Sequence, residues 1–247
     1  MPIISELSNQ WGGSHQKLIA AIKQISIAGG EYVKVQLLDS NWRKDRCINN
    51  GKDYLSIDFK FLEELKEICT EEGVSLFCSP LHEDALDWCL QLELFPLKIG
   101  NGVFKSRKEI LNKALNSEKP VLVSIESSEL DFFSELKQDY DNVKALVTSR
   151  NYPTLLEDSP IVEYDGSIIG FSDHTVGLSA CYFNLARGAK LLEKHYSLSH
   201  SWQSSMEAGH LGSMNMDQLS KLVSYERDIG IMNKNFFDNQ TLLDFWV

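Results

Sequence analysis

The stretch SIIGFSDHTVGLSACYFNLARGAKLLEKHY, residues 167–196, decides the fold. It begins with a β-branched apolar run at 167–171, continues through an amphipathic segment at 175–188 and ends in a second apolar run at 190–196. A strand, a helix and a second strand in this order predict parallel pairing with a right-handed crossover. The stretch therefore indicates a parallel sheet covered by helices.

The same alternation runs through the whole chain. Further strands are expected near 2–8, 32–38, 74–79, 96–100, 120–125 and 143–148. Further helices are expected near 14–28, 58–72, 82–92, 106–117, 128–138 and 214–229, with a shortened sixth helix near 154–163. Eight strand and helix units predict an α/β fold, a (β/α)8 TIM barrel. A doubly wound open sheet is the alternative, but no G-x-G-x-x-G follows the first strand.

The expected organisation is one domain over residues 1–247. The barrel should occupy about 1–230, and the tail at 231–247 ends in the apolar sequence FFDNQTLLDFWV. Exposed apolar surface of this size is unfavourable, so we expect the tail to dock on the barrel or on a partner chain.

Composition excludes several classes of protein. With 43% hydrophobic and 24% charged residues, the chain has the composition of a compact soluble protein. A net charge of -11 argues against nucleic-acid or anionic-membrane partners. No apolar run approaches the roughly 20 residues of a transmembrane helix. The five cysteines form no C-x-x-C pair and fit a reducing compartment, so a cytoplasmic location is expected.

Polar residues recur at the carboxyl end of the predicted strands, where the loops of such a barrel surround a pocket. They are Glu6, Lys34, Gln36, Ser79, Lys98, Asn101, Ser124, Tyr152, Ser172, Asp173, His174, Glu193 and His195. Singly, most have ordinary explanations as helix caps or solvated charges. Their agreement across eight strands predicts one functional site.

Two histidines follow consecutive strands at matching positions. Residues two apart share a face of a strand, so Ser172 lies with His174 and Glu193 lies with His195. If those faces point into the barrel mouth, two imidazoles meet beside carboxylates. Such a donor set suits a divalent transition metal with open positions for water and substrate.

Two lysines lie within apolar strands, Lys34 in YVKVQ and Lys98 in PLKIG. A buried, unpaired ammonium would cost several kcal/mol, so each lysine needs an anion. The anion could be a phosphate or carboxylate of a ligand, with serine hydroxyls as further donors. Structural ion pairs with Glu6 or Glu193 are the other explanation.

Several motifs resemble those of one enzyme family. GFSDHTVG, GAKLLEKHYSLS, EYVKVQ, FCSP, PLKIGNG and NYPTLLED are similar to motifs of the sialic acid synthase (N-acetylneuraminate synthase) family, and IISELSNQWGGS is similar to its opening motif. The resemblance implies a metal-dependent condensation of phosphoenolpyruvate with an N-acyl hexosamine or a related aldose. The products would be a nonulosonic, sialic-acid-like acid and phosphate.

The resemblance also implies roles for the site residues. His174 and His195 would ligate a divalent metal, manganese or else magnesium or cobalt, and Glu6, Glu193 and Lys98 would be catalytic. Phosphoenolpyruvate would be held by Lys34, Ser79, Lys98, Ser124 and Ser172, and the remaining substrate contacts would come from Gln36, Asn101 and Tyr152.

The chain also departs from the family pattern. Asn101 and Val103 stand where a hydroxyl and a sugar-binding carboxylate are usual, Glu126 enters a small turn, Arg150 replaces a small residue and 207–210 lacks another acidic contact. The family's carboxy-terminal antifreeze-like domain is expected to be absent. One alternative is therefore a catalytically degenerate barrel, acting as a ligand-binding or regulatory partner. Another is a keto-deoxy-octulosonate-type synthase. A homodimer, or pairing with a separate lid-domain protein, is expected.

Overall fold

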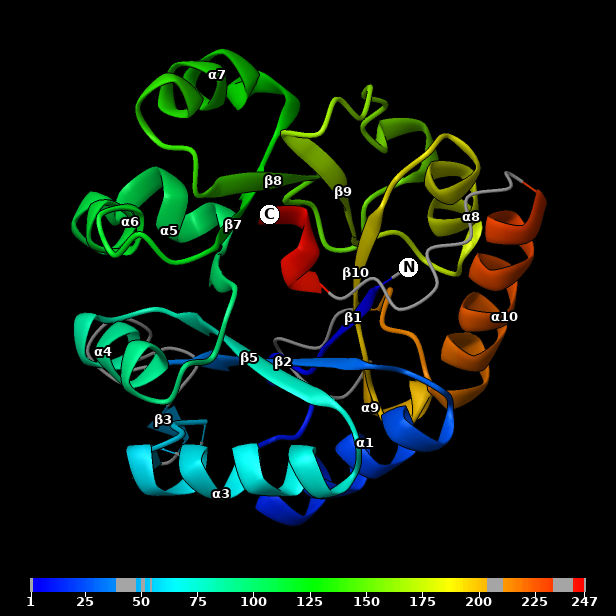
Figure 1. The fold of residues 1–247 in the computed structure, drawn as a ribbon. Helices are drawn as coiled ribbons and strands as arrows, with labels where there is room; N and C mark the ends of the chain where they lie inside the picture. The colour runs from blue at the N-terminus through cyan, green and yellow to red at the C-terminus, as the bar shows by residue number, and fades with distance from the viewer. Residues whose placement is uncertain are drawn as a thin grey trace.

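In the computed structural model, the described residues are 2–38, 48–49, 52–53, 55–203, 211–232 and 242–246. Eight parallel strands form one barrel with helices outside it (Figure 1). In chain order they are β1 (Ile3–Glu6), β2 (Tyr32–Leu37), β5 (Ser75–Pro80), β6 (Leu97–Ile99), β7 (Val121–Ile125), β8 (Val143–Thr148), β9 (Ile168–Asp173) and β10 (Leu191–His195). β1 pairs with both β2 and β10, and β5 packs against β6 to close the ring. The predicted TIM barrel is confirmed.

The helices follow the strands in the predicted alternation. They are α1 (His15–Ile27), α3 (Phe59–Glu71), α4 (Glu83–Gln91), α5 (Asn101–Ser106), α6 (Lys108–Leu115), α7 (Leu130–Asp139), α8 (Ser179–Ala186), α9 (His200–Gln203) and α10 (Met216–Met232). Short 3-10 turns lie at Ser127–Glu129, Leu156–Asp158 and Leu242–Trp246. The turn at Leu156–Asp158 occupies the place of the shortened sixth helix.

Local chemistry explains several helix ends. The side chain of Ser14 accepts a hydrogen bond from the N–H of Lys17, and that of Asp58 accepts one from Phe61, so both act as N-caps. Past three helix ends the backbone enters the left-handed region that glycine adopts without strain, at Gly29, Gly73 and Gly188.

The structure corrects two predicted helices and adds a hairpin. The helix predicted at 106–117 is α6, which starts only at Lys108 because Arg107 leaves the helical region with φ -124° and ψ 67°, and the preceding helix α5 was not predicted. The helix predicted at 175–188 starts only at Ser179, because Gly177 has a φ of +81° and Thr175 forms a β-bridge with Thr154. An antiparallel hairpin, β3 (Ile48–Asn49) with β4 (Lys52–Asp53), was not predicted.

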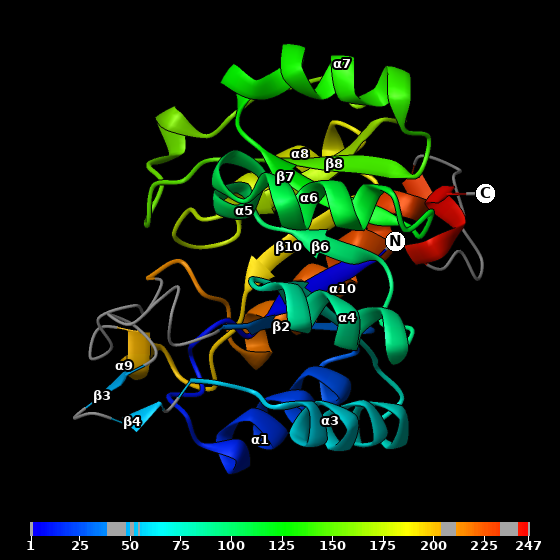
Figure 2. The same cartoon turned by 90° about the vertical axis from the view of Figure 1, so that its left-hand side faces the viewer.

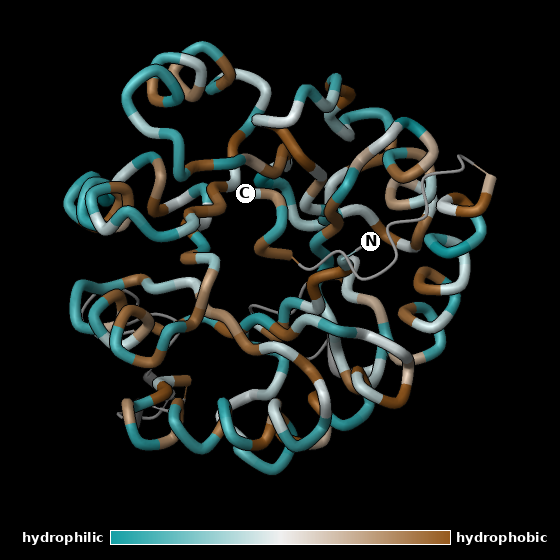
Figure 3. Tube along the Cα trace, viewed as in Figure 1, coloured by the Kyte–Doolittle hydropathy of each residue, from teal (hydrophilic) through white to brown (hydrophobic). Residues whose placement is uncertain are grey.

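Apolar side chains fill two layers. The larger cluster lies between the strands and the helices. Hydrophobic and hydrophilic residues alternate along the helices (Figure 3). A smaller cluster, here the interior cluster, fills the barrel itself. It consists of Ile4, Phe77, Leu122, Leu146, Ile169, Leu191 and Leu242.

The carboxy-terminal segment supplies one member of the interior cluster. Leu242 is 1% exposed, and its N–H donates to the hydroxyl of Tyr32 at 2.9 Å. Trp246 donates from Nε1 to the carbonyl of Asn142 at 2.7 Å. Figure 2 shows this segment at one end of the barrel and the β3–β4 hairpin at the other. The described part of the tail therefore packs on the barrel; residues 233–241 of the predicted tail lie outside the described ranges.

Two remaining sequence predictions concern membranes and cysteines. Within the described residues, no helix is long and apolar enough to cross a bilayer. Cys69, Cys78, Cys89 and Cys181 are buried free thiols, and Cys47 lies outside the described residues.

Candidate active site

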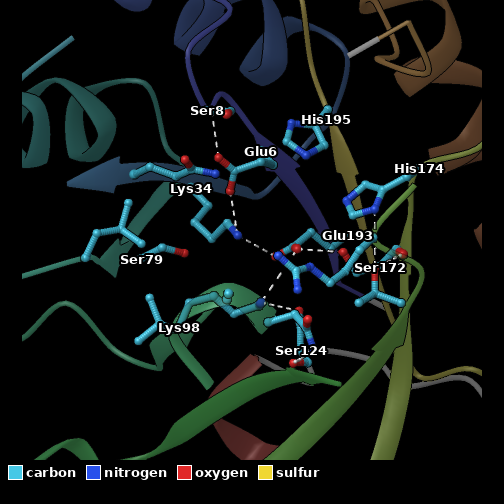
Figure 4. Close-up of a pocket in the computed structure, with 18 of the residues that line it drawn as sticks. Glu6, Ser8, Lys34, Ser79, Lys98, Ser124, Ser172, His174, Glu193 and His195 are labelled. Atoms are coloured by element: carbon cyan, nitrogen blue, oxygen red, sulfur yellow. Dashed lines mark hydrogen bonds and ion pairs between the residues drawn. The ribbon is translucent and has the colours of Figure 1, made fainter. Parts of the chain in front are cut away.

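A pocket of about 310 Å³ opens at the carboxyl ends of the strands (Figure 4). Along the inward face of several strands, apolar residues of the interior cluster give way to polar residues: Ile4 to Glu6 on β1, Leu122 to Ser124 on β7, Leu191 to Glu193 on β10. This two-residue step is the period of a strand, so the same face that packs the barrel also lines the pocket.

The structure brings the predicted site residues to this one pocket. Its lining includes Glu6, Lys34, Gln36, Ser79, Lys98, Asn101, Ser124, Tyr152, Ser172, His174, Glu193 and His195. Their positions match the sequence analysis, while the role of each residue stays a prediction.

Buried opposite charges form the base of the pocket. Lys34 Nζ lies 2.5 Å from Glu6 Oε2 and 2.9 Å from Glu193 Oε2, and Lys98 Nζ lies 3.7 Å from Glu193 Oε1. All four side chains are no more than 7% exposed. Both lysines thus form ion pairs with carboxylates of the chain, one of the two explanations considered from the sequence. Both also line the pocket, where an anionic ligand could reach them.

Hydroxyl groups surround these charges. Lys98 donates to Ser124 Oγ at 2.6 Å, and Ser172 donates to Glu193 at 2.8 Å. Ser79 Oγ is buried and has no hydrogen-bond partner among the described residues. Figure 4 shows this hydroxyl directed toward the space near Lys34 and Lys98. A buried hydroxyl in this position can donate to an anionic ligand.

Burial and ion pairing shift the pKa values of the cluster in opposite directions. Burial lowers the pKa of Lys34 to about 8, although Glu193 opposes the shift. Burial lowers the pKa of Lys98 as well, again against Glu193. Burial alone would raise the pKa of Glu193, but the two ammonium groups outweigh it and lower the pKa to about 2. Glu193 is therefore a carboxylate at neutral pH, and both ammonium groups are easier to deprotonate than exposed lysines.

The two histidines lie together on the opposite side of the pocket. The ring centroids of His174 and His195 are 5.3 Å apart, and the ring of Tyr152 lies 4.0 Å from that of His174. His174 Nδ1 is 2.5 Å from the carbonyl of Ser149, which can only accept, so Nδ1 carries the proton. Burial lowers the pKa of His174 to about 4, so the ring is neutral at pH 7 and Nε2 carries a lone pair.

This donor chemistry fits a divalent transition metal in part. A neutral imidazole fixed as the Nδ1–H tautomer by a backbone carbonyl is the usual state of a metal-binding histidine. Within the described ranges, however, no group of three or more His, Cys, Asp or Glu side chains gathers as a complete metal cluster. A metal held by His174 and His195 would need its other ligands from water or substrate.

The structure corrects the expectation that a carboxylate flanks each histidine within the site. Glu193 faces the pocket, but Asp173 points to the outer side of the barrel, where it pairs with Lys194 at 2.6 Å. Strand alternation explains the difference, because Asp173 is one residue from His174 whereas Glu193 is two residues from His195.

Asn101 is held by a residue that sequence reasoning missed. Its Nδ2 lies 2.5 Å from Glu129 Oε2 and 3.3 Å from the carbonyl of Ser124. Glu129 also accepts from the N–H of Glu126 in a reciprocal capping box. The sequence does contain the pattern for this capping box, because Glu129 lies three positions after Glu126 at the start of a helix.

Other lining residues were not predicted as site residues. They are Ser8, Leu81, Gly100, Gly102, Val103, Thr148 and Arg150. The strand pattern could have predicted Thr148, since it lies two residues after the inward-facing Leu146 and so on the same face of β8. Val103, at the position of a usual carboxylate, is 1% exposed and makes that wall apolar. The 207–210 segment lies outside the described residues.

The fold and this pocket place the protein among α/β barrels whose ligand sites lie at the carboxyl ends of the strands. Sequence comparison is more specific. The chain belongs to the NeuB family, which it matches over residues 31–236. The resemblance inferred from the motifs is confirmed.

Individual relatives support the same assignment. The chain is 25% identical over 230 residues to pseudaminic acid synthase of Campylobacter jejuni, covering 82% of this chain and 66% of the relative. It is 27% identical over 186 residues to human N-acetylneuraminate-9-phosphate synthase, covering 70% of this chain and 50% of the relative. The matches therefore span about two thirds or less of these relatives.

Solved structures show the same fold. The N-acetylneuraminic acid synthetase of Leptospira borgpetersenii, solved with citrate, aligns with a TM-score of 0.79 at 20% identity, over 99% of this chain and 90% of that one. Phospho-2-dehydro-3-deoxyheptonate aldolase of Thermotoga maritima aligns with a TM-score of 0.66 at 17% identity, over 94% of this chain and 70% of that one.

Proposed function

We propose that this protein condenses phosphoenolpyruvate with an N-acyl hexosamine or a related aldose to give a nonulosonic acid and phosphate. The observation that carries the proposal is the buried pair Lys34 and Lys98, which converge with serine hydroxyls opposite the imidazoles of His174 and His195. Relatives whose names describe synthases of nonulosonic acids support it.

The donor side of the pocket suits phosphoenolpyruvate. This ligand carries a phosphate and a carboxylate, and Lys34 and Lys98 would each bind one anionic group. Ser79 and Ser124 would donate hydroxyl hydrogen bonds to them. In the bound state the ligand would compete with Glu6 and Glu193 for the ammonium groups, so binding requires those ion pairs to rearrange.

The acceptor side would hold the aldehyde. His174 and His195 would hold a divalent ion such as Mn²⁺, with Mg²⁺ or Co²⁺ as substitutes, which would supply Lewis-acid polarisation of the aldehyde. Glu193, a carboxylate hydrogen-bonded to Ser172, can accept a proton at Oε1 or Oε2 during the reaction. Gln36 and Tyr152 would contact the sugar, and Asn101 would be a further substrate contact on the phosphate side.

Phosphate release tests the proposed function. We expect phosphate to be released from phosphoenolpyruvate only when Mn²⁺ and an N-acyl hexosamine are both present, and Lys98→Met to abolish the release. No release across a panel of N-acyl hexosamines and simple aldoses would overturn the proposal.

A binding barrel without turnover is the second candidate. The observation that favours it is that Lys34 and Lys98 already have carboxylate partners within the chain. This function predicts phosphoenolpyruvate binding without phosphate release, together with recovery of a full-length synthase or a separate lid-domain protein on co-purification.

A further inference from the structure

A buried ion pair lies directly behind the two histidines, on the outer face of β9 and β10. Asp173 and Lys194 are register partners, with 2.6 Å between Lys194 Nζ and Asp173 Oδ2. Both side chains have an exposure of 0%. His174 follows Asp173 and His195 follows Lys194, so this is the last pair of register partners before the two histidines.

Both members of the pair also hold the backbone that follows His174. Asp173 Oδ1 accepts from the N–H of Thr175 at 2.8 Å, and Lys194 Nζ donates to the carbonyl of Thr175 at 2.9 Å. Cys181 Sγ donates to Asp173 Oδ2 at 3.1 Å. Asp173 of β9 therefore holds the peptide unit before Thr175 and Lys194 of β10 holds the one after it, so the main chain that follows His174 is tied to both strands.

Stability alone is a weak explanation for this pair. A fully buried ion pair stabilises a protein little more than well-packed apolar side chains of the same volume, because the cost of desolvating the two charges offsets their attraction. What apolar side chains cannot supply is direction, since each hydrogen bond to Thr175 fixes an angle as well as a distance. In a strand, fixing the outward side chain also fixes the inward direction of its neighbours.

We propose that Asp173 and Lys194 are positioning residues that set the separation and orientation of the His174 and His195 imidazoles. The inference rests on the proposed function, in which those rings hold a metal. The geometry concerned belongs to the metal-free protein, so it can be measured without metal.

The test variant is Asp173→Asn combined with Lys194→Met. It removes both charges while keeping side-chain volume, and the new amide retains an oxygen for the N–H of Thr175, so the variant is designed to fold. Lys194→Met alone is the second variant, because Asp173 keeps its bonds from Thr175 and Cys181. The control is Leu65→Ala, which removes a buried side chain of α3 away from β9 and β10.

Two readouts distinguish positioning from stability. The first is the Nδ1–H signal of His174 in metal-free protein labelled with 15N-histidine, assigned with His174→Asn; its bond to Ser149 should make it sharp in the wild type. The second is Co²⁺ affinity. We expect the double variant to lose or shift the ring signal and to bind Co²⁺ about 10- to 100-fold more weakly. Leu65→Ala should keep both properties despite a lower melting temperature.

An unchanged ring signal and Co²⁺ affinity in the double variant, with a lower melting temperature, would overturn the proposal and leave the pair a structural role. If the double variant does not fold, Lys194→Met alone is judged by the same two readouts. If the wild type binds no Co²⁺, the metal in the proposed function is wrong, and the ring signal alone then decides whether Asp173 and Lys194 position His174.

Discussion

At the residue scale, Lys34 makes ligand binding depend on pH. Its pKa is lowered to about 8 by burial, so the cation is progressively lost above pH 8. If the ammonium binds an anionic group of phosphoenolpyruvate, the association constant should fall up to about tenfold per pH unit between pH 8 and 10. Calorimetric titrations of phosphoenolpyruvate across this pH range measure the association constant. A constant affinity, with circular dichroism showing an intact fold, would contradict the role of Lys34.

His174 gives the metal-free protein a different pH dependence. Its pKa is lowered from 6.5 to about 4, so between these values the unfolded chain binds a proton that the folded protein does not. The stability that this group contributes is complete above pH 6.5 and is lost as the pH falls through 4, by about 3 kcal/mol at most. Urea unfolding should show a smaller loss over this window in His174→Asn.

The control for that prediction is His200→Asn, at an exposed histidine of α9 that does not line the pocket. An equal acid-induced loss of stability in wild type and His174→Asn would mean that the folded and unfolded chains protonate this imidazole over the same pH range. The lowered pKa of His174 would then be wrong.

At the element scale, β9 and β10 approach each other more closely than a side chain allows. A Cβ added at Gly170 would lie 1.9 Å from the carbonyl oxygen of Leu191, an atom of the β10 backbone that cannot move aside. We expect Gly170→Ala to destabilise the protein by more than about 4 kcal/mol, as measured by urea unfolding. A loss below about 1 kcal/mol would mean that the two strands can separate freely.

The matched control lies in α5. A Cβ added at Gly102 has no atom within 4 Å, and alanine favours the helix by about 0.5–1 kcal/mol over glycine. Gly102→Ala should therefore leave stability unchanged or raise it slightly. The contrast between the two substitutions isolates the close strand contact from the general effect of replacing glycine.

Elements with a clear period were predictable from sequence, and those set by tertiary contacts were not. β2 and β8 match their predicted spans closely because apolar, β-branched runs mark buried strands. The helix α5 was missed because its six residues are too few to show a helical period. The start of α6 was predicted at 106 rather than 108, because the sequence does not show the backbone turn at Arg107, whose side chain is held by Glu109 and the carbonyl of Leu81.

The site was predictable for a related reason. Two-residue parity placed Lys34, Ser172 and Glu193 on one inward face, and the barrel brought those faces together. Parity in the sequence alone could not reveal that Glu129 orients Asn101, since that contact joins elements 28 positions apart. Nor could it show that Asp173 and Lys194 pair on the outer face.

At the scale of the whole molecule, the carboxy-terminal segment closes the end of the barrel opposite the pocket. Leu242 is buried in the interior cluster, whereas its neighbour Leu243 is 42% exposed. Leu242→Ala should cost about 2–5 kcal/mol of stability, because it leaves a cavity in the interior cluster of the barrel. Leu243→Ala should change stability by less than about 0.5 kcal/mol. Equal, small effects in urea unfolding would mean that the segment does not pack in solution.

We infer that Lys34 and Lys98 form an anion-binding site for phosphoenolpyruvate. Calorimetric titration of phosphoenolpyruvate into Mn²⁺-loaded protein tests it most directly, with Lys98→Met as the test variant. Lys113→Met is the control, since it removes the same charge at a 37% exposed lysine that does not line the pocket. We expect saturable binding to the wild type and to Lys113→Met, and none to Lys98→Met. Absence of binding to the wild type, or equal binding to Lys98→Met, would contradict it.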